Sequence, residues 1–217
     1  MNTFERTETR AVLNARADFL AKVWAYFGLA IATAAVGAYF GKEIIMLTHS
    51  FYVPYGIFMV LMFTQSMWAN SKTFALPMFL VFAFSSGTIL YPTLAFAAQT
   101  GQISAVIQAL AASAGLFFAA AIFGYTTKKD LSGMGQFLFF TMIGVFIAGI
   151  VNIFIGSSIM SFIISCISVV LFSAYTAYDL QAIKNGAYDS AIMAATHLYI
   201  NIFALFNNLL NIFLARD

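Results

Sequence analysis

The sequence predicts an all-α integral membrane protein with about seven transmembrane helices, its N-terminus in the cytoplasm and its C-terminus outside. Of its 217 residues, 62% are hydrophobic and only 8% are charged, whereas a soluble domain carries roughly a quarter charged residues. A chain with so few charges cannot cover a water-facing surface, so lipid must be the solvent for most of it. Its apolar residues also form runs of about 20, the length that a helix needs to cross a bilayer.

Seven runs are candidates for these spans: 20–41, 52–70, 73–98, 103–125, 135–156, 157–179 and 191–214. The third run contains Pro77 and Pro92, which we expect to bend or end its helix. Only Gly156-Ser157-Ser158 separates the fifth run from the sixth. Six spans therefore stay open as an alternative if these two runs do not form a tight hairpin.

The distribution of Lys and Arg predicts the orientation. Eight of these residues fall on the N-terminal side of the predicted spans, namely Arg6, Arg10, Arg16, Lys22, Lys72, Lys128, Lys129 and Lys184, and the other side has Lys42 and Arg216. Positive charge collects in the cytoplasm, so the N-terminus is expected inside and, after an odd number of spans, the C-terminus outside. Residues 1–19, in which acids and bases alternate, are expected to form a cytoplasmic tail, and residues 20–217 a single transmembrane domain.

Polar side chains form one stripe on each of the last two spans. At about 100° per residue, the sixth span aligns Ser161, Ser165, Ser168, Tyr175 and Asp179, and the seventh aligns His197, Asn201, Asn208 and Asn211. We expect the two stripes to face each other or a shared cavity, because neither can face lipid cheaply. Such residues either only hold helices together or line an ion pathway. Our candidates for an ion pathway or a pH sensor are Asp179, Asn201, His197, Asn208, Ser165 and Ser168.

Asp179 is the carboxyl of greatest interest, because charge within a membrane is costly and usually functional. Burial would favour its neutral form, whereas a wet interface would leave it ionised, and the sequence does not decide between the two. His197 has no second histidine or carboxylate at a ligand-like spacing, so we expect it to be hydrogen-bonded rather than to bind a metal.

Motifs for membrane enzymes are missing. The last span has no lysine for a retinal Schiff base, and Ser113-Ala114-Gly115 is no nucleophile elbow. We find no His-Glu-x-x-His zinc motif and no phosphate-binding glycine loop, and Cys166, the only cysteine, excludes an internal disulfide. We expect a protein without enzymatic activity, cofactor or resident metal, and the net charge of +2 gives no reason to expect nucleic acid as a partner.

Two segments near the C-terminus carry a family resemblance: Tyr178-Asp179-Leu180-Gln181-Ala182-Ile183, and the stretch from His197 to Phe203. Both resemble motifs of the Bax inhibitor-1 family, also called the transmembrane Bax-inhibitor-motif family. The bacterial YccA-type branch is the most similar, through Thr126–Ser132, Asn152-Ile153-Phe154 and the terminal Ala215-Arg216-Asp217.

The resemblance implies seven helices with the N-terminus inside and, in some members, a pH-sensitive calcium leak governed by two carboxylates. The first falls on Asp179, but the second falls on Asn201, which is not a carboxylate. An amide cannot share a proton as a second carboxylate does, although Asn201 can still hydrogen-bond Asp179 and hold a pore shut.

The YccA-type branch implies a different role, in which the protein binds a membrane-anchored AAA protease of the FtsH type and restrains its action on other membrane proteins. Our leading hypothesis is therefore a modulator of membrane-protein quality control in the bacterial inner membrane. The alternative is a calcium or proton leak lined by the sixth and seventh spans.

Overall fold

The computed structural model describes residues 3–216, with side chains from residue 14 onward, and every regular element in that range is helical. The elements in chain order are α1 (Thr3–Tyr39), α2 (Gly41–Thr48), α3 (Tyr52–Phe63), α4 (Gln65–Trp68), α5 (Ala75–Gln99), α6 (Ile103–Thr126), the 3₁₀ turn η1 (Ser132–Met134), α7 (Gly135–Ile155), α8 (Ser158–Asn185) and α9 (Ala191–Leu214). The expected tail over residues 1–19 lies mostly outside the residues whose side chains are described.

Six of the expected spans are continuous apolar helices. They are Asn14–Tyr39 within α1, then α5, α6, η1 with α7, α8 and α9, and each has at least 24 residues. At 1.5 Å per residue, such a helix is about 36 Å long, which exceeds the roughly 30 Å of a bilayer core. The predicted multi-pass helical architecture is thus confirmed for these six.

The second expected span, over 52–70, is not one helix, and that prediction was wrong in this respect. Helix α3 stops after 12 residues, and the four-residue α4 follows a break at Thr64. Across the break, the Trp68 indole N–H turns back and donates to the Leu61 carbonyl at 2.9 Å. Helix α2 meets α3 at an angle of 103°, so this pair forms at most one bent crossing and the described residues contain six or seven spans.

We expected Pro77 and Pro92 to bend or end the helix that contains them, and neither proline ends α5. Pro77 lies in the first turn, where a helix needs no backbone N–H donor. Pro92 lies inside the helix, which nevertheless continues to Gln99.

The fifth and sixth expected spans do form a tight hairpin. Helix α7 ends at Ile155 and α8 begins at Ser158, and Gly156 between them adopts the left-handed conformation with φ 69°. Ser157 caps α8 by accepting a hydrogen bond from the Met160 amide at 3.2 Å. The alternative of six spans depended on these two runs not forming a hairpin, so it no longer applies at this boundary.

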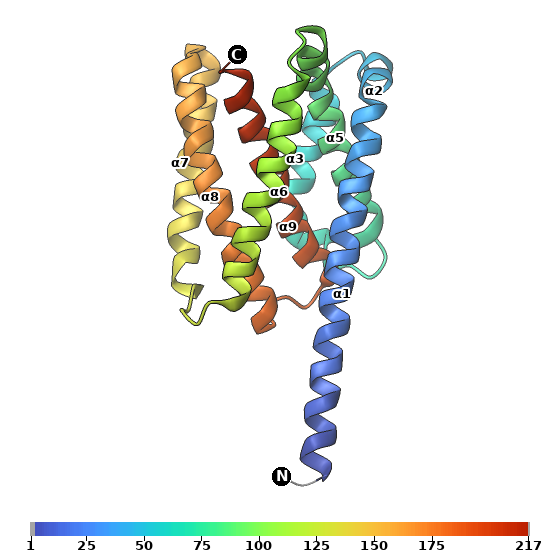
Figure 1. Ribbon diagram of the computed structural model, residues 1–217. Helices are drawn as coiled ribbons and strands as arrows, with labels where there is room; N and C mark the ends of the chain where they lie inside the picture. The colour runs from blue at the N-terminus through green and yellow to red at the C-terminus, as the bar shows by residue number, and fades with distance from the viewer. Residues whose placement is uncertain (1–2, 217) are drawn as a thin grey trace.

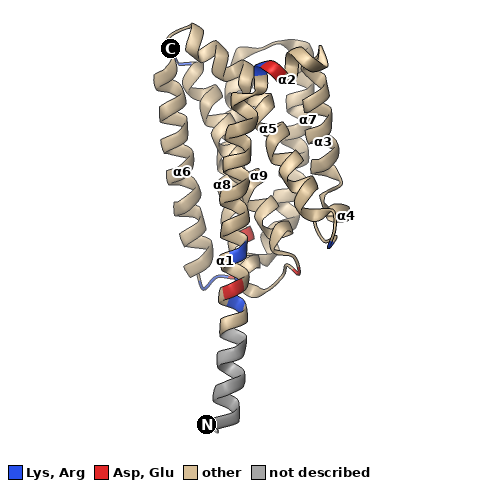
Figure 2. Cartoon of the chain, turned by 90° about the vertical axis from the view of Figure 1, so that its right-hand side faces the viewer, with Lys and Arg blue, Asp and Glu red and all other residues tan. Residues whose placement is uncertain are grey.

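The charged residues lie toward the two ends of the bundle (Figure 2). We call one of these the basic end, since it carries the α6–α7 and α8–α9 connections and most of the described cations: Arg16, Lys22, Lys72, Lys128, Lys129 and Lys184. The opposite end carries the α7–α8 hairpin, Lys42 and Arg216.

Helix α9 lies at the centre of the bundle and packs on α1, α5, α6 and α8 (Figure 1). Helix α7 lies at the edge and packs mainly on α8. Only Leu138 of α7 is fully buried, so most of its surface is left to lipid. Of the two polar stripes, Ser165, Ser168 and Asp179 on α8 and Asn201 on α9 are buried inside the bundle.

Glycines set the closest helix crossings. A Cβ atom on Gly37 or Gly87 would overlap the backbone of the facing helix where α1 crosses α5, and one on Gly124 would overlap the backbone at Ala177 where α6 crosses α8. Small residues permit this close approach, which is a main source of helix association in lipid.

Gly124→Ala is therefore expected to destabilise the protein, and Gly115→Ala in the same helix serves as its control. Overpacking against a backbone that cannot move costs about 1–3 kcal/mol. A Cβ atom on Gly115 meets no atom within 4 Å, so that change should gain the helix preference of alanine, about 0.5–1 kcal/mol. Thermal unfolding of both purified variants in detergent measures the difference, and equal melting temperatures would contradict the packing described here.

Candidate functional site

The Asp179 carboxyl is buried between α8 and α9, with 2% of the residue exposed. Asn201 Nδ2 donates to Asp179 Oδ2 at 2.7 Å, and the Tyr188 hydroxyl donates to Oδ1 at 3.0 Å. His197 Nδ1 lies 3.8 Å from Oδ1. We call these four residues the Asp179 cluster.

The α8–α9 connection places Tyr188 over the carboxyl. Gly186 ends α8 in the left-handed conformation with φ 78°, which a glycine adopts without strain. Ser190 then caps α9 by accepting a hydrogen bond from the Met193 amide, and its hydroxyl donates to the Ala69 carbonyl at 2.7 Å. The connection is thus fixed both to α9 and to the segment that follows α4.

The partners of Asp179 differ in chemistry. Burial, and after it the nearby Asp179 carboxyl, raises the pKa of the Tyr188 phenol far above its usual value, so Tyr188 stays protonated and acts as a donor. Asn201 donates through a neutral amide. His197 brings an imidazole whose side chain is 30% exposed. The cluster thus places a buried acid beside a partly accessible imidazole.

The predicted stripes meet directly at the basic end only. There, Asp179 contacts Asn201 and His197, as expected from their positions on the two helices. Ser168 is buried farther along α8, toward the opposite end. Asn208 donates to the Ala204 carbonyl of its own helix at 2.8 Å and does not bond across to α8.

A second polar site lies toward the opposite end. A pocket of about 480 Å³ opens between α7, α8 and α9, and its polar lining consists of Asn152, Ser158, Ser161, Ser165, Asn208 and Asn211. Asn152 of α7 donates to the Ser161 hydroxyl at 2.6 Å. Ser165 and Asn208 thus share this pocket, whereas Asp179, His197 and Asn201 belong to the cluster at the basic end.

Sequence reasoning missed Tyr188 and Gln181. Helical periodicity could not find Tyr188, since it lies in a connection whose path depends on Gly186. Gln181 lies two residues after Asp179 in the motif that carries the family resemblance. This position was the only feature of the sequence that could have marked Gln181 as functional. Its amide accepts from the Leu131 N–H at 2.7 Å and donates to the Lys129 carbonyl at 2.8 Å, so it fastens the α6–α7 connection to α8.

No three His, Cys, Asp or Glu side chains come together as a metal site among the residues that the structure describes. The oxygen donors of the Asp179 cluster are one carboxyl, one amide and one phenol. This set is poorer in charge than the carboxylate-rich sites that hold calcium tightly.

A comparison with known protein families settles the relationship. The family model described as "Inhibitor of apoptosis-promoting Bax1" matches residues 16–217. The chain belongs to the Bax inhibitor-1 family. The predicted family resemblance is thereby confirmed, and the match begins within α1 and includes every later helix.

Bacterial relatives support the assignment. An uncharacterized membrane protein of Streptococcus pyogenes serotype M3 is 37% identical over 219 residues, covering 92% of this chain and 93% of the relative. Uncharacterized proteins of Deinococcus radiodurans and Helicobacter pylori strain J99 are 35% and 33% identical, each covering 92% of this chain and 91% and 89% of the relative. This Bax inhibitor-1 family member is therefore a multi-pass membrane protein with bacterial relatives.

Asn201→Leu is expected to destabilise the protein more than Asn208→Leu does. Removing Asn201 leaves one oxygen of a buried carboxyl without its donor, and losing a hydrogen bond to such a group costs about 1.5–3 kcal/mol. Removing Asn208 loses only a bond within its own helix, with an expected cost of about 0.6 kcal/mol. Unfolding of the two matched variants in mixed detergent micelles measures both values, and an equal loss would show that the Asp179–Asn201 bond adds little.

Proposed function

We propose that this Bax inhibitor-1 family protein is a gated membrane pathway for calcium or protons, lined by α8 and α9 and closed at the Asp179 cluster. The observation that carries the proposal is the buried carboxyl itself, which is 2% exposed and bonded to Asn201 and Tyr188. Neutral hydroxyls and amides suffice to hold membrane helices together. Placing an acid among them adds a large desolvation cost. A site for protons or cations requires such an acid, whereas simple helix packing does not.

The pocket at the opposite end supports the same reading. Its hydroxyl and amide oxygens are ligands that a hydrated hard cation accepts readily. The two polar sites lie on the same pair of helices, with the buried Ser168 in the stretch of α8 that separates them. This arrangement fits a pathway that is shut in its middle and at the basic end.

The pathway would use one carboxyl where the family resemblance implies two. Asn201 occupies the second position and donates to Asp179, so the two groups cannot share a proton between acids. His197, 3.8 Å from Asp179, supplies the second titratable group instead. Both residues carry ionisable side chains at the proposed closure, so we expect flux to depend on pH.

Calcium uptake into proteoliposomes tests the proposal between about pH 6 and 8, the range in which a histidine titrates. The wild type should carry calcium above the level of empty liposomes with a clear pH dependence, and Asp179→Asn should change that flux several-fold and flatten its pH profile. Glu43→Gln is the matched control, because Glu43 is an exposed acid on α2 at the opposite end. Flux that is absent at every pH, or indifferent to Asp179→Asn, overturns the pathway.

A second candidate is a modulator of membrane-protein quality control that acts through an FtsH-type protease. The amide at Asn201 favours it, because this position lacks the second carboxylate that a calcium leak of the family would use. Co-purification from crosslinked membranes tests this role. A modulator should carry a membrane-anchored AAA protease with it, and its deletion should speed the turnover of that protease's membrane substrates. If no such protease co-purifies and deletion leaves the turnover of its membrane substrates unchanged, this role is excluded.

The same reading includes seven crossings with the N-terminus inside, the bent α2–α3 pair being the second crossing. This orientation is supported by the cations at the basic end (Figure 2). Lys and Arg are enriched on the cytoplasmic side of membrane proteins, so the basic end would lie in the cytoplasm. The Lys128→Cys variant should stay unlabelled by an impermeant thiol reagent in intact cells, and its labelling would contradict this orientation.

A further inference from the structure

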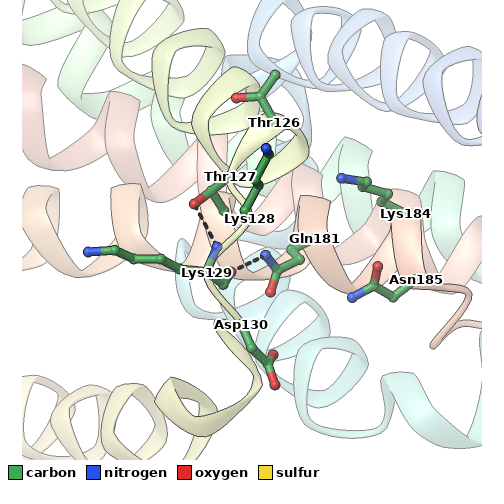
Figure 3. A pocket seen from close by; sticks show the side chains of 8 residues that line it. All are labelled: Thr126, Thr127, Lys128, Lys129, Asp130, Gln181, Lys184 and Asn185. Carbon is green, nitrogen blue, oxygen red and sulfur yellow. Dashed lines mark hydrogen bonds between the residues drawn. The ribbon is translucent and has the colours of Figure 1, made fainter.

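A lysine-lined pocket at the basic end is separate from the Asp179 cluster. It has a volume of about 530 Å³ and lies where the α6–α7 connection crosses the last turns of α8 (Figure 3). Three lysines line it, namely Lys128, Lys129 and Lys184, together with Thr127, Gln181 and Asn185. Neither the proposed pathway nor the family assignment uses these residues as a group.

The backbone that carries the lysines is held in place. Gln181, 7% exposed, binds the Lys129 carbonyl and the Leu131 amide at the same time. The Lys129 amide also donates to the Thr127 hydroxyl at 3.3 Å. The Lys184 ammonium donates to the Tyr125 carbonyl at 2.7 Å and lies 5.4 Å from the centre of the Tyr125 ring. These hydrogen bonds preform the pocket in the absence of a ligand.

Its charge favours an anion. The one acid in its lining is Asp130, whose carboxyl accepts a hydrogen bond from the Ser132 amide at 2.9 Å, and this bond lowers the pKa of Asp130. Asp130 is therefore ionised at neutral pH, which leaves three ammonium groups against one carboxylate. Figure 3 shows Asp130 pointing away from Lys128 and Lys184, and Lys129 extending in a third direction, so the side of the pocket between Lys128 and Lys184 lacks a counter-charge from its own lining.

An exposed apolar surface continues directly from the pocket along α6. Ile122 is 63% exposed, Phe123 54% and Tyr125 44%, and in a membrane these side chains meet acyl chains. A soluble anion would gain nothing from contact with this apolar surface. A phospholipid uses both parts, because its headgroup is charged and its tails are apolar.

We propose that this pocket binds the phosphate of an anionic phospholipid headgroup, with the acyl chains lying against the exposed side of α6. The shared chemistry is that of a phosphate anion, and the α6 surface favours the lipid as its source. Basic pockets between membrane helices are suited to such headgroups. This site does not depend on ion conduction, so it stands or falls separately from the proposed function.

Titration of the full-length protein in neutral detergent with phosphatidylglycerol, followed by native mass spectrometry, tests the proposal. Lys128→Gln with Lys129→Gln should weaken binding on the order of 25-fold, since each lysine near a lipid surface contributes about 1 kcal/mol. Both lysines are exposed, and circular dichroism checks that the double variant is folded. Lys72→Gln is the control, because Lys72 lies at the same end but outside the pocket.

Phosphatidylcholine, inorganic phosphate and an acidic peptide complete the experiment. The proposal expects phosphatidylglycerol to bind most tightly and its advantage over phosphatidylcholine to vanish in the double variant. It is overturned if the double variant binds phosphatidylglycerol as the wild type does, or if Lys72→Gln weakens binding equally. It is also overturned if inorganic phosphate saturates the site at the same concentration as the lipid, or if the peptide binds more tightly there, since the pocket would then serve a soluble partner.

Discussion

Lipid offers no hydrogen-bond partners, and this constraint governs the whole structure. Each polar side chain in the bundle must find its partner within the protein. The hydroxyls of Thr176 and Thr196 satisfy this by donating to carbonyls one turn back in their own helices. The Asp179 carboxyl instead accepts two hydrogen bonds, and the interior of its own helix has no free backbone N–H to supply them. It therefore lies at the one place where α9 and the α8–α9 connection supply donors from two directions.

Close helix approach follows from the same constraint, since lipid provides no hydrophobic force between helices. Glycines at the α1–α5 and α6–α8 crossings let backbones touch, and these contacts enclose α9 on several sides. Helix α7 lacks such a crossing and packs mainly on α8. The bundle thus has a tight body around α9 and a looser edge at α7, and the 480 Å³ polar pocket opens between that edge and the body.

The sequence predicted what depends on composition and helical periodicity. Six long spans, the turn at Gly156 and the meeting of Asp179 with Asn201 follow from apolar length, glycine and the 3.6-residue repeat. It did not predict features that depend on contacts between distant or irregular segments. At the break after α3, Trp68 bonds back to Leu61, and Tyr188 reaches Asp179 only through the path of a short connection. The lysine pocket likewise depends on Gln181 bonding residues about 50 positions earlier.

The last turns of α8 carry two unrelated attachments on opposite sides. Asp179 is bonded to α9, while Gln181, two residues on, is bonded to the α6–α7 connection. A helix turns as a rigid body over so short a distance, so any twist that parts Asp179 from Asn201 also pulls on the segment that holds Lys128 and Lys129. The end of α8 therefore joins the buried acid and the lysine pocket at the membrane surface through one short rigid segment.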